Sequence, residues 1–345
     1  MLREAAFHSD PCDMTMSMMR EKQYEACERR LLAHPPVALF SAEATDLDAQ
    51  ALYEHSYAYP GRLTCLVTLK ELRRDVRALL PVESLYVSFA EREMLERLIL
   101  HEGEMVMTDW DDIGAAESLV RRLWCGFRTE GSDWILTLPK TLMEPIMAAL
   151  NRSEMLGIRD RCFRYDATIH GLLYLTGLLH ASQALDFFLT HVMRVPSPRA
   201  DEIGRRYMQA TFEYISDEAG DMILLHPGLA NPYQLVKRQE LGAMGAFEMS
   251  QTMMAGGMNG ILPEEAPLHE KLCLSLKGAM RPDYDLNEAA EDLRMLAKQG
   301  VSLEEMEDVL SSLVAVLPTP EMLGALKQLY EGTPRWLGLK AALEH

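Results

Sequence analysis

Apolar residues recur every three or four positions across residues 89–101, with charged residues between them. This spacing predicts an amphipathic helix, which Gly103 ends. A short apolar patch at 105–107 follows, and acidic residues at 109–112 suit the N-terminus of a second helix that runs to Gly126. Aromatic and β-branched residues then flank a Gly-containing turn at 130–133, which predicts a hairpin over 127–138. Helix, strand, helix and hairpin is the order of a winged helix.

The helix before the hairpin would enter the major groove in a DNA-binding winged helix. Here it contains Arg121 and Arg122, and Arg128 follows on the first hairpin strand. However, residues 85–140 contain 11 acidic and 6 basic residues, a net charge of −5. Because duplex binding depends on neutralising phosphates, this balance favours a structural or protein-docking module over a DNA reader.

The first part of the chain is predicted to be helical over residues 20–34, 46–57 and 63–80. The third of these segments is locally basic, with Lys70, Arg73, Arg74 and Arg77. They are candidate contacts to nucleic acid or to an acidic partner. The alternative is a solvated helix face, which charge runs of this size usually form.

After Pro139 the pattern is helical throughout. Residues 167–185 contain no charge, a length that raises the question of a membrane span. His170, His180, Gln183 and two glycines interrupt this run, so we expect instead a central helix buried among other helices. Shorter helices are predicted at 201–214, 231–252, 267–277, 287–298, 303–316 and 320–330.

These patterns predict a mainly α, multi-helical fold with one winged-helix-like α/β module that contains a short hairpin. We expect an N-terminal helical segment (1–84), the winged-helix-like module (85–140), a central helical segment (141–195) and an acidic C-terminal helical domain (199–342). The boundary is placed at Pro196-Ser197-Pro198, and residues 343–345 resemble the remnant of a histidine tag.

Overall charge restricts the partners. The 345 residues have a formal net charge of −18, and residues 283–308 alone contain 9 acidic and 2 basic residues. Such a surface disfavours nonspecific binding to nucleic acid or to anionic membranes. The first residues lack an apolar run of signal-peptide length, so we expect a cytoplasmic protein.

No motif predicts a catalytic, cofactor or metal site. The six cysteines form no C-x-x-C pair. His170, His180 and His191 cannot chelate one ion from a single helix, because their spacings differ from the i, i+4 pair that does. The glycine-rich residues 256–260 lack the Lys-Ser/Thr of a phosphate loop and are expected to be a flexible helix connection. Trp110, Trp124 and Trp134 are expected in the core of the central module.

Three short motifs carry a resemblance to a family. They are Leu69-Lys70-Glu71-Leu72, the hairpin and Leu-Pro of residues 127–139, and Thr333-Pro334-Arg335-Trp336. Together they resemble uncharacterised bacterial proteins, common in Firmicutes, of the SEC-C-associated type, which combine Rho-N-like and winged-helix-like segments with further helices. The resemblance implies the same fold class. It implies no metal role, because the zinc motif of that family is missing here.

Three functional hypotheses follow. The first is a non-enzymatic, protein-binding helical scaffold whose acidic C-terminal helices face a basic partner. The second is a regulatory DNA- or RNA-binding protein that uses Lys70, Arg73, Arg74 and Arg77 with Arg121, Arg122 and Arg128. The third is an enzyme with a site assembled from residues far apart in the sequence.

Overall fold

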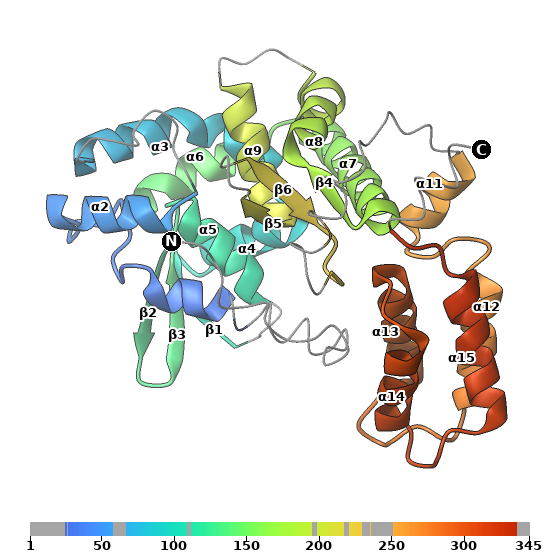
Figure 1. The fold of residues 1–345 in the computed structure, drawn as a ribbon. Coiled ribbons are helices and arrows are strands. Elements are labelled where there is room, and N and C mark those ends of the chain that lie inside the picture. Colours follow the sequence, from blue (N-terminus) through green and yellow to red (C-terminus); the bar gives the residue numbers. More distant parts are fainter. Residues whose placement is uncertain are drawn as a thin grey trace. The chain divides into compact units, whose positions relative to one another are not determined.

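The computed structural model describes residues 25, 27–57, 67–108, 112–194, 199–216, 221–229, 235 and 251–336. These residues are mainly helical, with two small three-stranded antiparallel sheets, which confirms the predicted mainly α fold class. The chain forms two compact units (Figure 1). The first unit comprises Lys22–Asp166 and Ala181–Phe212, and the second contains Ala167–His180 and Glu213–His345. The predicted module 85–140 lies within the first unit, whereas the predicted segments 141–195 and 199–342 are each divided between the two units.

The first unit surrounds a three-stranded sheet with helices. The elements that precede and form this sheet are α2 (Asp46–His55), α3 (Leu69–Glu83), η2 (Ser84–Tyr86), α4 (Phe89–Leu100), β1 (Glu104–Met107), α5 (Ile113–Arg121), β2 (Gly126–Glu130) and β3 (Asp133–Thr137). After them come α6 (Lys140–Leu150), the start of α7 (Met155–Thr176), α8 (Ala181–Phe188), η4 (Leu189–Met193) and α9 (Ala200–Thr211). The predicted order of helix, strand, helix and hairpin is therefore present in residues 89–137.

The sheet has the strand order β1-β3-β2, with β3 antiparallel to both neighbours. Phe127 pairs in register with Leu136, and both side chains are buried. Trp124 is also buried, as expected, whereas Trp134 is only half-buried and packs edge-on against Phe127 at 5.5 Å. Trp110 lies outside the described residues. The module thus has its own apolar centre.

Helix α5, which precedes the hairpin, is covered on nearly all sides. Every residue from Ala115 to Val120 is buried, including the polar residues Glu117 and Ser118. Glu117 forms an ion pair with Arg30 at 2.7 Å, and the Tyr57 hydroxyl lies 3.3 Å from the Ser118 hydroxyl. A helix surrounded in this way holds the unit together and presents no open face on which a duplex groove could lie.

The second unit contains a sheet that the sequence pattern does not predict. Its elements are the end of α7, β4 (Leu178–His180), β5 (Glu213–Ser216), β6 (Met222–Leu225), α11 (Gln251–Met258), α12 (Ala266–Leu276), α13 (Leu286–Gln299), α14 (Leu303–Leu313) and α15 (Pro320–Gly332). The strands pair antiparallel in the order β4-β6-β5. The expectation of purely helical structure after Pro139 is therefore wrong, and so is that of one continuous helix over 167–185.

The break in the uncharged run occurs at Gly177. Its φ of 77° lies in the left-handed region that favours glycine, and α7 ends one residue earlier. The Thr176 hydroxyl donates to the carbonyls of Leu172 and Leu178 at 2.8 and 2.7 Å. The chain therefore turns out of the helix and enters β4 directly. Among the described residues, no helix has both the length and the apolar character that crossing a membrane requires.

We expect Gly177→Ala to lower the free energy of unfolding of the second unit by about 2 kcal/mol, combining left-handed strain with overpacking. A Cβ at this position would lie 2.7 Å from both Leu235 and Trp336. Gly131→Ala is the matched control, because Gly131 has a similar φ of 64° and open space around it. Urea titrations of both variants separate the two causes. Equal losses would show that the Trp336 contact adds nothing.

The glycine-rich residues 256–260 do not form the expected flexible connection. Gly256 and Gly257 lie inside α11, and Gly257 packs directly on Gly171 of α7. A Cβ on Gly257 would lie 2.6 Å from the Gly171 carbonyl oxygen. The glycines allow two helix backbones to approach closely, which is a packing role rather than a phosphate-binding one. Most of the predicted helix at 231–252 lies outside the described residues.

The C-terminal helices α12, α13, α14 and α15 agree with the four predicted there and share one apolar core. The connection after α12 and the connection after α14 lie together at one end of these helices (Figure 1). They are joined there because the Ala315 amide donates to the Ala279 carbonyl at 2.8 Å. Asp285 caps α13, and Gly300 ends it with a φ of 80°. Local capping thus fixes where each helix begins and ends.

Candidate functional site

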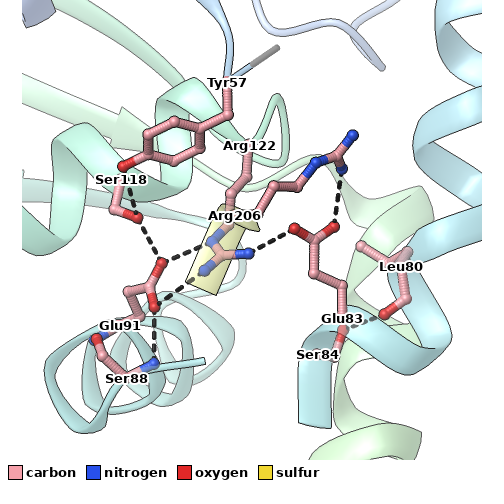
Figure 2. A network of polar contacts seen from close by, with 9 residues as sticks. All are labelled: Tyr57, Leu80, Glu83, Ser84, Ser88, Glu91, Ser118, Arg122 and Arg206. Carbon is pink, nitrogen blue, oxygen red and sulfur yellow. Dashed lines mark hydrogen bonds and ion pairs between the residues drawn. The ribbon is translucent and has the colours of Figure 1, made fainter. Parts of the chain in front are cut away.

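A fully buried ion-pair network lies in the first unit and is named here the Arg122 network. Figure 2 shows Arg122 between two carboxylates, with Arg206 on the far side of Glu83. Arg122 reaches Glu91 at 2.7 Å and Glu83 at 2.6 Å, and Arg206 reaches the other oxygen of Glu83 at 3.1 Å. All four side chains are at most 1% exposed. Two negative and two positive charges therefore balance inside the unit.

Local structure explains how Glu91 comes to lie in this network. It is the third residue of α4 and closes the capping box with Ser88, whose backbone amide donates to it at 2.7 Å. The Ser118 hydroxyl donates to it from α5 at 2.6 Å. Burial alone would raise the pKa of the Glu91 carboxyl, but Arg122 and these hydrogen bonds outweigh it and lower the pKa. Glu91 is thus a carboxylate held charged inside the fold.

The position of Arg122 differs from the predicted one, since Arg122 was expected to contact nucleic acid or a partner. Arg122 is 0% exposed, so it lies inside the unit rather than on a surface that could meet nucleic acid. Arg121 is partly exposed, pairs with Glu117 at 3.0 Å and lies 4.2 Å from the centre of the Tyr57 ring. Arg128 lies between Glu104 and Glu130, at 3.2 and 2.9 Å. These three arginines neutralise carboxylates of the unit itself.

The basic residues of α3 lie on its outer side but differ in what they contact. Arg73 donates to the backbone carbonyls of Leu39 and Ser41, both at 2.8 Å, and so ties a loop to the helix. Arg74 is exposed and pairs with the neighbouring Asp75 at 3.1 Å.

Two further cations of this helix are exposed to solvent. Arg77 stacks over the Phe40 ring at 5.1 Å, and Lys70 lies on the same helix one residue after its start. Among the described residues, no contact that the structure shows joins a cation of α3 to Arg121, Arg122 or Arg128.

A second buried network lies in the second unit and is named here the Glu265 network. The Glu265 carboxylate, which is 0% exposed, pairs with Lys298 at 2.7 Å and with Arg294 at 3.4 Å. The Tyr174 hydroxyl and the Leu262 backbone amide also donate to it. Arg294 donates in turn to Tyr174 and to the Gly260 carbonyl. One carboxylate thus connects the loop before α12 with α7 and α13.

Trp336 closes this network at the end of the described chain. Its indole N–H donates to the Tyr174 carbonyl at 2.8 Å, and its backbone amide donates to the Lys298 carbonyl at 3.1 Å. Burial lowers the pKa of Lys298, and the contact with Glu265 opposes that shift. Thr333 and Trp336 of the motif that carries the family resemblance are therefore buried, and Trp336 belongs to an apolar core of this unit.

Cysteine thiols and clusters of metal-ligating side chains are the groups beside these networks that could take part in catalysis. The described free thiols of Cys125 and Cys162 are buried, and burial raises the pKa of both, to about 12 for Cys162. Cys273 is partly exposed and lies 3.6 Å from His269, but burial raises the pKa of its thiol as well. Within the described residues, no three His, Cys, Asp or Glu side chains come together as metal ligands. The contacts of the two networks join helices within each unit.

His226 supplies a pH test of the second unit. Its Nδ1 accepts the Gly228 amide at 3.0 Å, and its ring packs against Trp336 at 5.5 Å. Burial, followed by nearby Lys298, lowers its pKa to about 3. The folded unit therefore keeps His226 neutral where the unfolded chain is protonated, and stability falls as the pH drops below about 6.5.

Replacing His226 with Gln should remove this dependence. We expect the difference in unfolding free energy between wild type and His226→Gln to fall by up to about 1.4 kcal/mol per pH unit between about pH 6.5 and 4. Urea titrations at half-unit pH steps measure it, and other titrating groups cancel in the difference. A difference that stays flat over this window would contradict the assignment.

All exposed charged side chains of residues 283–308 are acidic. Both cations of the segment, Arg294 and Lys298, are buried in the Glu265 network. Of its nine acidic residues six are exposed, namely Asp283, Asp285, Glu288, Glu304, Glu305 and Asp308. No cation of the segment is exposed among them, and we name these six residues the acidic surface.

In comparisons with known proteins, no family model, no curated protein and no solved structure matches this chain. The resemblance to SEC-C-associated proteins stays a prediction. Function is therefore argued from the surfaces and networks described above.

Proposed function

We propose that this chain is a non-enzymatic, protein-binding scaffold of the cytoplasm whose acidic surface binds a basic partner protein. The observation that supports this most is the burial of Arg294 and Lys298, because every charged side chain that stays exposed along residues 283–308 is a carboxylate. A surface of one charge attracts and orients a partner of the opposite charge.

The winged-helix-like order of elements in residues 89–137 fits this proposal as a docking or structural module. In a groove-binding protein the helix before the wing has an open face, whereas α5 is buried from Ala115 to Val120. Among the basic residues assigned to the nucleic-acid hypothesis, Arg122 is internal and Arg121 and Arg128 neutralise carboxylates. These placements favour a protein partner over a duplex.

Two residues of the acidic surface cap helices and must stay unchanged in the test. Glu305 closes the capping box of α14 with Ser302, and Asp285 caps α13. Glu304 and Asp308 lie four residues apart on α14, so they are on the same side of that helix. These two exposed side chains are the ones to change.

The experiment titrates a fluorescent amphipathic peptide with a Lys-rich polar face into the full chain. We expect binding that weakens as salt rises, and about a ten-fold loss of affinity when Glu304→Gln and Asp308→Asn are combined. The matched control is Glu93→Gln with Glu144→Gln, which removes the same charge from exposed positions of the first unit. Equal losses in both double variants, or no binding by the wild type, would refute the proposal.

A further inference from the structure

Three large apolar side chains of the first unit are exposed beside one arginine. Phe89 at the start of α4 is 69% exposed, and Leu156 and Phe163 on α7 are 75% and 73% exposed. The Arg159 guanidinium lies 5.5 Å from the centre of the Phe89 ring. We name these four residues the Arg159 patch. Single exposed apolar residues are ordinary on protein surfaces, but neighbouring ones mark interaction sites.

Helical spacing shows that the patch is continuous. Leu156 and Phe163 are seven residues apart on α7, so they lie on the same side of the helix, separated by about 10.5 Å at 1.5 Å per residue. Arg159 is three residues after Leu156 and four before Phe163, which makes it a neighbour of both. Because Arg159 also reaches Phe89, it joins the two helices at the centre of the patch.

The charge at the centre of the patch is positive, although exposed acids also lie near it, Glu93 one turn after Phe89 and Glu154 two residues before Leu156. Arg159 has no carboxylate partner among the described residues, and neither has exposed Arg152, just before α7. Asp160, the exposed acid of this helix face, is already paired with Arg164 at 2.8 Å. A chain with a net charge of −18 thus keeps a cation without a carboxylate partner among the described residues, Arg159, beside the exposed Phe89 ring.

We propose that the Arg159 patch is the docking site for an acidic amphipathic helix of a partner protein. Apolar side chains one and two turns apart on that helix would cover Leu156 and Phe163, the spacing that helix-in-groove recognition uses. A carboxylate of the same helix would pair with Arg159, because docking removes water from this cation and leaves it costly to bury alone.

The Arg159 patch is separate from the acidic surface, because the patch lies in the first unit and the acidic surface in the second. The patch would bind an acidic partner, whereas the acidic surface would bind a basic one. A nucleic acid is disfavoured as the occupant, because Leu156 offers nothing to a phosphate and only a few cations surround the patch. A second copy of the chain is the remaining alternative, and the test separates all three.

The test screens the full chain against a displayed library of helical peptides with randomised surface positions. We expect one class of enriched peptides to combine Asp or Glu with Leu, Ile or Phe at i, i+3 or i+4, and i+7. For a synthetic copy of one enriched peptide, Arg159→Gln and Phe163→Ser should each weaken binding by about ten-fold or more. Because both positions lie on the surface, the variants should keep the wild-type circular dichroism spectrum.

Two control variants show whether the effect is specific to the patch. Leu47→Ser removes an equally exposed apolar side chain from α2, and Arg74→Gln removes an exposed cation from α3. Both should bind the peptide as the wild type does. An enriched set without acidic peptides, equal losses in the controls, or binding of duplex DNA or single-stranded RNA through Arg159 would each overturn the proposal. So would self-association in sedimentation that Phe163→Ser abolishes. Basic peptides in the enriched set belong to the acidic surface if Glu304→Gln with Asp308→Asn weakens their binding, but if Arg159→Gln weakens it they too overturn the proposal.

Discussion

Arg122→Met is expected to lower the free energy of unfolding by about 3–5 kcal/mol, the usual cost of removing one partner from a buried ion pair. The substitution leaves Glu91 fully buried without its cation, although Met fills much of the same volume. The Glu83 carboxylate keeps its contact with Arg206 at 3.1 Å, so the damage centres on Glu91. Urea titrations followed by far-ultraviolet circular dichroism measure the loss.

The matched control is Arg128→Met. Arg128 is an arginine of the same unit with two carboxylate partners, but those partners, Glu104 and Glu130, are exposed. We expect a change of about 1 kcal/mol or less, because solvent screens exposed pairs. If both variants lost the same stability, burial of the Arg122 network would not be what makes Arg122 important.

A second variant distinguishes charge from packing. If the cost arises from an unpaired buried carboxylate, adding Glu91→Gln to Arg122→Met should recover part of the lost stability. If the cost arises from packing alone, the double variant should be less stable than either single one. The pKa of Glu91, lowered in the fold, adds a pH signature. The stability that the charged Glu91 carboxylate adds to the fold is present above the pKa of about 4.5 that this group has in the unfolded chain. It is lost as the pH falls below that value.

Glu265→Gln should have an effect of similar size in the second unit, again about 3–5 kcal/mol. Glu265 is the buried anion that both Lys298 and Arg294 contact, so its removal takes away their shared carboxylate and leaves Arg294 only the partly exposed Glu291 at 3.5 Å. Hydrogen exchange of the amides of α13 measures the loss as a lower free energy of local opening. This readout reports on the second unit even where the two units unfold separately.

The neighbouring residue provides the control. Glu264 has the same charge and lies one position earlier, but it is exposed. Glu264→Gln should change the opening free energy of α13 by about 0.5 kcal/mol or less. Should the two substitutions have the same effect, the Glu265 network would have no special part in holding α13.

Sequence patterns predicted the helices well where capping residues and periodicity agree. Ser302 with Glu305 and Thr319 with Pro320 mark the starts of α14 and α15, and both signals are local. The central hairpin was predicted for the same reason, since its turn at Gly131 is visible in the sequence. Local chemistry therefore determined most of these element boundaries.

The second sheet was missed because its strands are short and far apart in the chain. Leu178–His180 has three residues and Met222–Leu225 has four, and short apolar runs do not distinguish a strand from a buried helix. Gly177 was the one signal for the break, but an isolated glycine inside a helical pattern is usually tolerated.

The buried networks were beyond prediction for a different reason. Arg206 and Glu83 are 123 residues apart, and Arg294 and Tyr174 are 120 apart. In a chain with so many charged residues, nothing local marks which ones are buried. Only the Ser88-x-x-Glu91 capping signal could have drawn attention to Glu91. As a result, Arg122 was assigned to the surface, and the burial of Arg294 and Lys298 within residues 283–308 was not predicted.

The most direct test of the scaffold proposal compares two probes on the same protein. The Lys-rich peptide and a duplex DNA of similar length are each titrated into the full chain at low salt, with wild type and the Glu304→Gln, Asp308→Asn double variant. We predict that the wild type binds the peptide, that the double variant binds it about ten-fold more weakly, and that neither binds the duplex. Salt-sensitive duplex binding that is lost on reversing the charges of Lys70 and Arg77 would contradict the proposal.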